Sequence, residues 1–567
     1  MASQNIDFAA ARRRIEAAYD PRLIESAGQK LVELLAAHLR KVERSERPVL
    51  NWADPREYVA EAEGIADGGG EKKRDERGEK SEKDGGGDSV EALSGRFAEL
   101  VKTSLERGIN LHDPRYVGHQ VPASVPIAGL FDAIGSVTNQ CMAIYEMGPW
   151  ATAVEQAMIG KLAGFLGWQG TDYAGIVTHG ASLANLTALL VARNVTLPES
   201  WEQGIAADGS SMSPLKKGTV PPGSADLSEE INSLERDSPL FQQVDRSGAR
   251  PAHVAPKLVV QSDAHYCIAR SAGVLGIGTN HVVKAPLDDR RRMDPAQLDA
   301  ILGDLRRAGH PIVAVVACAC ATPVGAFDPL EQIADVCARH SVWLHVDAAH
   351  GGAALLSNRH RHLVAGLERA DSLTWDAHKM LFVPSLCAFL FYKNKRHSFE
   401  AFRQNAPYLF DPSAPGLAEF DSGLRTVECT KRAAAFGLWG VWSLFGPQLF
   451  ADMVDVTFEL GRVFYDKLNA APDFAALHEP ECNIVVFRHV PQELQGAPPE
   501  RIGEFQWQLR RAVIESGEFY LVPTTHGGVA ALRCTLINPL TTEAHLDLLL
   551  DTLRRHGREI LRSEPAR

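Results

Sequence analysis

A single stretch decides the fold: residues 343–393 read WLHVDAAHGGAALLSNRHRHLVAGLERADSLTWDAHKMLFVPSLCAFLFYK. A short apolar strand, predicted at Val342–Asp347, opens this stretch and ends in a carboxylate, and small residues follow it. Strands without polar alternation are typical of a parallel sheet that is covered on both faces. Ligands of such sheets bind beyond the carboxyl ends of the strands. We therefore expect Asp347 at the rim of a ligand-binding cleft.

Outward from this stretch, short apolar strands alternate with helices. The predicted strands are Ala174–Thr178, Lys257–Gln261 and Ile312–Ala317, and the predicted helices are 182–194 and 329–339. This alternation predicts an α/β fold with a mostly parallel sheet. The rule that places ligands at strand ends then selects Gly180–Ser182, Asp263–His265 and Thr322 as neighbours of Asp347.

Three features of the sequence indicate a binding or catalytic role: the strand-end carboxylate of Asp347, the segment Thr178–Ser182 and Lys379. Thr178–Ser182, THGAS, joins a strand to a helix, and a helix N-terminus reached over small residues suits a phosphate. Lys379 lies in a mostly apolar segment, where desolvation lowers the pKa of an amine and favours Schiff-base formation. Taken alone, each has an ordinary structural explanation: a capped turn, a surface lysine, and for Asp347 a strand-end carboxylate. Together they match the parts that pyridoxal phosphate requires.

The stretch 343–393, with its HVDAA and HK elements, closely resembles the group II pyridoxal-phosphate-dependent amino-acid decarboxylases. The likeness extends over about 114–190 and 256–550. It implies an aminotransferase-like (fold type I) large domain, an N-terminal helical segment and a smaller α+β C-terminal domain. It also implies pyridoxal 5'-phosphate as the cofactor and a homodimer whose active site lies at the subunit interface.

The resemblance assigns roles to individual residues. Lys379 looks like the lysine that carries the cofactor, and Asp347 looks like the partner of the cofactor's ring nitrogen. His265 is similar to the histidine that stacks on the ring and assists proton transfer. The remaining expected cofactor contacts are Ala181, Ser182, Thr322 and His378.

Three further residues bear on the reaction and its substrate. Tyr408 lies where the family has a tyrosine that protonates Cα, and this tyrosine favours simple decarboxylation over aldehyde formation. Arg533 resembles an arginine that holds the substrate carboxylate, for which a guanidinium fork is well suited. Gln120 is a candidate substrate contact.

The sequence also departs from the family pattern. Asp376 stands where many relatives have asparagine, His350 where an aromatic residue is expected, and Ala321 where a threonine is common. These departures concern the substrate more than the cofactor. We expect a small acidic substrate such as glutamate, aspartate or cysteine sulfinate, with an aromatic L-amino acid as the alternative. An aldehyde synthase, an aminotransferase and a non-catalytic homologue remain open.

Bulk properties narrow the function classes. The 567 residues carry a net charge of −12, which argues against nucleic acid or an anionic membrane as a partner. The first twenty residues lack the apolar core of a signal peptide, and no apolar run is long enough to span a membrane. Nine scattered cysteines indicate a reducing, cytoplasmic location. Cys318 and Cys320 form a CxC without a second pair, so we predict no metal site.

The chain is long enough for two or three structural units. We expect an N-terminal helical segment at 1–112, a large cofactor-binding domain at 113–432 and a small domain at 433–567. The glycine-bracketed charged run at 67–88 and the polar segment at about 197–256 read as a linker and an insertion.

Overall fold

The computed structural model describes residues 8–66, 89–170, 172–205, 255–402 and 419–563. Tyr408, the charged run at 67–88 and most of the segment 197–256 lie outside these residues. Among the described helices, none is long and apolar enough to cross a membrane.

The centre of the molecule is a seven-stranded sheet in the order β1-β7-β6-β5-β4-β2-β3. Its strands are β1 (Ala174–Thr178), β2 (Lys257–Gln261), β3 (Val282–Ala285), β4 (Ile312–Cys318), β5 (Leu344–Asp347), β6 (Ser372–Asp376) and β7 (Ala388–Tyr392). Only β7 runs antiparallel to its neighbours β1 and β6, so the expected mostly parallel sheet is confirmed. β4, β5 and β6 are buried along their whole length, which explains why they lack polar alternation.

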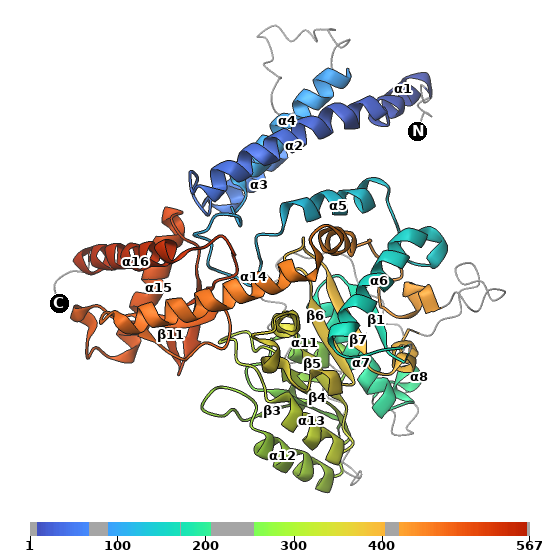
Figure 1. Cartoon of the computed structure of the whole chain (residues 1–567), viewed down its shortest axis with the longest axis vertical. Coiled ribbons are helices and arrows are strands. Elements are labelled where there is room, and N and C mark those ends of the chain that lie inside the picture. Colours follow the sequence, from blue (N-terminus) through green and yellow to red (C-terminus); the bar gives the residue numbers. More distant parts are fainter. Residues whose placement is uncertain (1–7, 67–88, 171, 206–254, 403–418, 564–567) are drawn as a thin grey trace, which may run out of the picture.

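Helices lie on the two faces of this sheet (Figure 1). Those that pack against its strands are α6 (Pro149–Phe165), α7 (Ala181–Thr196), α12 (Pro295–Arg307) and α13 (Leu330–Arg339), and the same part of the chain contains α5 (Pro126–Val137), α8 (Ser200–Gln203) and α11 (Cys267–Val274). The predicted helices at 182–194 and 329–339 correspond to α7 and α13. The site depends most on α7, since it starts directly after β1 and is buried over most of its length.

A second, four-stranded antiparallel sheet has the order β10-β11-β9-β8. It contains β8 (Phe474–Ala476), β9 (Ile484–His489), β10 (Val522–His526) and β11 (Val529–Thr535), with α15 (Pro499–Ser516) and α16 (Glu543–Ser563) beside it. The long helix α14 (Phe436–Ala470) runs from the large sheet to this smaller one (Figure 1). α14 bends at Gly446, which has a φ of 72° and is followed by Pro447. The expected α+β C-terminal part is therefore present.

Four N-terminal helices extend away from the body of the molecule (Figure 1): α1 (Phe8–Ala18), α2 (Pro21–Glu43), α3 (Pro55–Ala66) and α4 (Val90–Arg107). α2 and α4 are joined by a hydrogen bond between Ser26 and Ser94 (3.0 Å). The segment that follows α2 reaches the C-terminal part, where Val49 N–H donates to the carbonyl of Gly517 (2.7 Å). The proposed domain boundaries after residues 112 and 432 both fall between helices.

Candidate active site

A cavity of about 350 Å³ opens where β4, β5 and β6 end and α7 begins. Its lining residues are Gln120, His179, Gly180, Ala181, Ser182, His265, Cys318, Cys320, Thr322, Asp347, Ala349, His350, Asp376, His378, Lys379 and Leu386. Larger hollows, of about 620, 640, 480 and 520 Å³, lie elsewhere and contain none of the predicted site residues. The predicted site residues therefore identify the smaller cavity as the candidate active site.

The structure brings most of the predicted residues together. Lys379, Asp347, His265, Ala181, Ser182, Thr322, His378 and Gln120 all line this one cavity. Arg533, on β11, lies directly behind it, because its Nη2 donates to the carbonyl oxygen of Thr322 (2.8 Å). Tyr408 falls outside the described residues, so its role stays a prediction.

Lys379 faces a carboxylate that the sequence analysis counted only as a departure from the family. Its Nζ lies 3.0 Å from Oδ2 of Asp376, at the end of β6. Burial lowers the pKa of Lys379, but the carboxylates of Asp376 and Asp347 outweigh burial, so the pKa is raised. The expected lowering was therefore wrong in its net direction, because the desolvation argument left out these two acids.

Asp347 is held by donors on both carboxylate oxygens. Its Oδ2 accepts a hydrogen bond from the amide of Asn185 on α7 (2.9 Å). Its Oδ1 accepts from the backbone N–H of Ala349 (3.1 Å). Asp347 is buried at the end of β5. The strand and the helix α7, which comes from another part of the chain, therefore fix the direction of this carboxylate.

Two histidines of the cavity are oriented by backbone groups. The N–H of Cys267 donates to Nδ1 of His265 (3.3 Å), which leaves the proton of a neutral ring on Nε2. Burial lowers the pKa of His265, and nearby Asp347 opposes this shift. Nδ1 of His378 donates to the carbonyl of Cys387 (2.9 Å). Both rings are thus fixed in place before any ligand binds.

The start of α7 has the form of an anion cradle. Gly180 precedes the helix with a φ of 101°, a conformation that is essentially restricted to glycine. No side chain caps the helix, and the N–H groups of Ala181 and Ser182 have no partner among the described residues, so they are available to a ligand. The N-cap position belongs to Gly180, so Ser182 lies inside the first turn and does not cap it. A phosphate group suits this end of the helix.

Arg533 is a buried cation without an acidic partner. Its side chain is 6% exposed, and its Nε has no hydrogen-bond partner among the described residues. No described aspartate or glutamate forms an ion pair with it. Burial lowers its pKa. A guanidinium in this state favours an anionic ligand.

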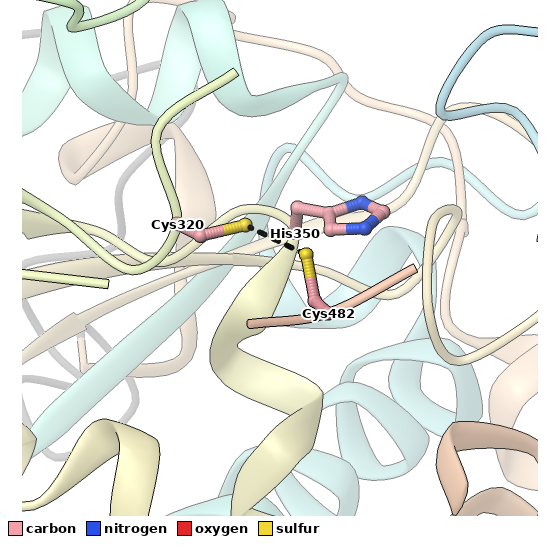
Figure 2. A group of neighbouring side chains, drawn as sticks. All are labelled: Cys320, His350 and Cys482. Atoms are coloured by element: carbon pink, nitrogen blue, oxygen red, sulfur yellow. Dashed lines mark hydrogen bonds between the residues drawn. The ribbon is translucent and has the colours of Figure 1, made fainter. Parts of the chain in front are cut away.

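Next to Arg533 lies a buried cluster of two thiols and an imidazole, and two of its members, Cys320 and His350, line the cavity. Figure 2 shows Cys320, His350 and Cys482 directed toward one another, and the two sulfur atoms lie 3.9 Å apart. One ligand atom from each of the three lies within 4.8 Å of the others. The hydrogen bond with Cys482 and burial raise the pKa of the Cys320 thiol, and burial lowers the pKa of His350 to about 3. These two groups are therefore uncharged at neutral pH.

Sequence reasoning missed several members of the site. Cys482 begins the segment that leads into β9 and has no motif around it, and Asn185 sits inside a helix pattern. His179 forms a short hydrogen bond to Glu428 (2.5 Å), from a segment more than 200 residues away. Only the position of Asn185, one turn after the cradle, could have marked it as a residue that faces the cleft.

The residues fit pyridoxal phosphate. The uncapped start of α7 suits its phosphate, the carboxylate of Asp347 suits a protonated ring nitrogen, and Lys379 provides the amine. The fold and the site together define the class of the protein, a fold type I pyridoxal-phosphate enzyme.

Comparison with known proteins defines the class more narrowly. Residues 237–490 match the pyridoxal-dependent decarboxylase conserved domain. Human acidic amino acid decarboxylase GADL1 is 28% identical over 475 residues, which cover 82% of this chain and 82% of the relative. Human cysteine sulfinic acid decarboxylase is 29% identical over 481 residues, covering 84% and 87%. The crystal structure of mouse CSAD superimposes with a TM-score of 0.75 at 26% identity, over 95% of this chain and 99% of that one.

The chain therefore carries a pyridoxal-dependent decarboxylase domain, and it is a pyridoxal-phosphate-dependent carboxy-lyase. A solved structure of Oryza sativa TDC with PLP and tryptamine shares the fold, with a TM-score of 0.75 at 20% identity over 96% of this chain and 99% of that one.

Proposed function

We propose that this enzyme removes the α-carboxylate of a small acidic L-amino acid and releases the amine and CO2. The observation that carries the choice of substrate is Arg533, a buried guanidinium without an acidic partner in the described part of the chain. The uncharged side chains of Cys320 and His350 stand beside the cavity and do not neutralise it. An acidic substrate side chain would supply the missing negative charge.

Two further observations support an acidic substrate. The names of the relatives specify an acidic amino acid in one case and cysteine sulfinic acid in the other. The cavity, about 350 Å³, has to hold both the cofactor and the substrate, and this space favours a short side chain.

When bound, pyridoxal phosphate supplies a ring that accepts the electrons of the broken bond between Cα and the carboxylate. In our proposal Lys379 holds the cofactor, and Asp347 keeps negative charge beside its ring nitrogen. The start of α7 and His378 hold the phosphate, and His265 covers the ring. Arg533 binds the acidic side chain, with Gln120 on the substrate side, and the hydroxyl of Tyr408 delivers a proton to Cα.

The test is a decarboxylation assay on the cofactor-loaded protein with a panel of L-amino acids, scored by the mass of the amine. We expect product from aspartate, glutamate or cysteine sulfinate. Arg533→Met should raise KM for that substrate about 100-fold, because a charge-assisted double hydrogen bond is lost. Its cofactor absorbance should stay unchanged.

Each other outcome of this assay selects a different function. Amine from aromatic amino acids alone would replace the acidic substrate with the aromatic alternative. An aldehyde product would identify an aldehyde synthase, and transfer of the amino group to an oxo acid would identify an aminotransferase. Bound cofactor without any product would leave a non-catalytic homologue.

We also propose a cytoplasmic homodimer. The N-terminal helices α1 and α2 carry exposed apolar side chains, among them Phe8, Ile15, Ile24 and Val32. An unpaired apolar surface of this kind is typical of an interface. All nine cysteines are free, as a reducing compartment requires. Light scattering after size exclusion should give twice the chain mass, and removal of residues 1–43 should shift it to the monomer.

A further inference from the structure

A continuous chain of buried hydrogen bonds ends on Asp347. The indole N–H of Trp343 donates to Oγ of Ser372 (2.9 Å), which lies 2.8 Å from Nδ1 of His345. Nε2 of His345 lies 2.9 Å from Oδ1 of Asn185, and Nδ2 of Asn185 donates to Oδ2 of Asp347 (2.9 Å). All five side chains are buried, and they come from β5 with the residue before it, from β6 and from α7.

The two ends of the chain determine where its protons lie. An indole N–H can only donate, and an ionised carboxylate can only accept. With the amide N–H of Asn185 on Asp347, its carbonyl faces His345, so His345 carries its proton on Nε2. Nδ1 of His345 then accepts from the hydroxyl of Ser372. Every donor along the chain meets an acceptor.

The reversed arrangement is unfavourable. It would turn the carbonyl of Asn185 toward Asp347, and a hydrogen bond there would require a protonated carboxyl. It would also make Ser372 accept hydrogen bonds from both Trp343 and His345. The hydroxyl proton of Ser372 would then have no acceptor within the chain. In a buried network, a donor or acceptor without a partner costs more free energy than an average hydrogen bond contributes.

His345 can serve as a neutral link. It is fully buried, and burial lowers its pKa to about 4, so the ring carries no charge at neutral pH. The second N–H of the Asn185 amide also has a partner, Sγ of Cys267 at 3.4 Å. Asn185 is therefore satisfied on both of its polar atoms and cannot rotate without losing several contacts.

We propose that Asn185 and His345 are positioning residues, which orient the carboxylate of Asp347 and aim it at the ring nitrogen of the cofactor. They act through the direction of the hydrogen-bond chain and need no contact with the cofactor. This role is the same whichever amino acid is the substrate. It follows that the electronic state of the cofactor ring is set partly by residues that lie behind the active site.

The test uses the holoenzyme loaded with pyridoxal phosphate labelled with ¹⁵N in its ring. Asn185→Leu removes the donor to Asp347 and keeps the size of the side chain. We expect the ring-nitrogen signal to move toward that of an unprotonated pyridine, and kcat to fall about 10- to 100-fold, as for outer ligands that orient a catalytic group. KM should change much less than kcat, because the substrate side of the cavity is untouched.

Asn194→Leu is the matched control, since Asn194 is a buried amide on the same helix that bonds to Glu400 instead of the site. It should leave the nitrogen signal at the wild-type position. If Asn185→Leu does not fold, the pair His345→Leu and His345→Gln carries the test: leucine should reproduce the shift, and glutamine, which has both a donor and an acceptor, should restore the signal. A wild-type nitrogen signal in Asn185→Leu or in His345→Leu overturns the proposal.

Discussion

At the scale of single residues, the pair Lys379 and Asp376 has the clearest consequence. A lysine attacks a carbonyl group as the neutral amine, whereas the carboxylate 3.0 Å away stabilises its charged form. The site therefore holds Lys379 charged until the pair is separated. We therefore expect an acid at position 376 to affect cofactor loading more than it affects the fold.

The variant Asp376→Asn tests this coupling. Removal of the carboxylate should lower the pKa of Lys379, and attachment of added pyridoxal phosphate should then reach half-completion at a pH lower by about one unit or more. Absorbance of the attached cofactor as a function of pH measures the shift. Asp335→Asn, on the exposed side of α13, is the control and should leave the midpoint in place. An unchanged midpoint in Asp376→Asn would show that the ion pair does not limit loading.

The cluster of Cys320, His350 and Cys482 bears on the prediction that the protein has no metal site. Two thiols and an imidazole are ligands that zinc accepts. If the prediction is right, metal analysis of the purified holoenzyme gives far less than one equivalent of zinc, and dialysis against a chelator leaves the decarboxylation rate unchanged. Stoichiometric zinc that is lost in Cys482→Ser would reverse the prediction and locate the ion.

At the scale of elements, the close approach of α14 to β9 decides how the two sheets are joined. Gly461 of α14 lies against the backbone of Cys482 and Asn483, just before β9, so closely that a Cβ has no room. Asn483 in turn holds His350 through a hydrogen bond of 2.9 Å. The helix packing thus reaches the wall of the cavity.

Gly461→Ala should destabilise the protein by about 1–3 kcal/mol, because the added methyl group forces α14 away from β9. Gly95→Ala on α4 is the matched control, since nothing lies within 4 Å of a Cβ at that position. It should be neutral or stabilise by about 0.5–1 kcal/mol through the helix preference of alanine. Denaturant unfolding curves of both variants measure the difference, and equal midpoints would contradict the close-packing argument.

At the scale of the whole molecule, a buried neutral histidine makes stability depend on pH. The pKa of His345 is about 4 in the folded protein and close to 6.5 when the chain unfolds. Below pH 6.5 the unfolded chain binds a proton that the folded chain does not. Stability is therefore complete above about pH 6.5 and falls as the pH decreases toward 4.

Between pH 8 and pH 5, His345 alone should remove about 2 kcal/mol of stability. The measurement compares the unfolding free energy of the wild type and of His345→Gln at both pH values, and the variant should lose less. Buried Asp328, whose pKa burial raises to about 7, acts in the opposite direction. Since Asp328 is present in both proteins, the difference isolates His345, and parallel pH profiles would exclude this contribution.

Much of the fold was predictable from the sequence because the signals for it are local. The strands at Ala174–Thr178 and Lys257–Gln261 have the predicted bounds, since a short apolar run between turn residues is buried on both faces of the sheet. The rule that ligands bind at strand ends then grouped Asp347, Thr322 and His265 correctly in one cavity. These residues follow directly from strands that can be recognised one at a time.

The tertiary structure alone decided which side chains meet across those strands. Asn185 reaches Asp347 from 162 residues away, and Cys482 reaches Cys320 from the other sheet across the same separation of 162 residues. Such pairs depend on strand register and helix packing, which no local pattern encodes. The raised pKa of Lys379 has the same origin, because the net charge around a buried group depends on distances to residues that the sequence does not place. Sequence thus determined the fold, the cofactor and the class of reaction, whereas the electrostatics of the site required the folded chain.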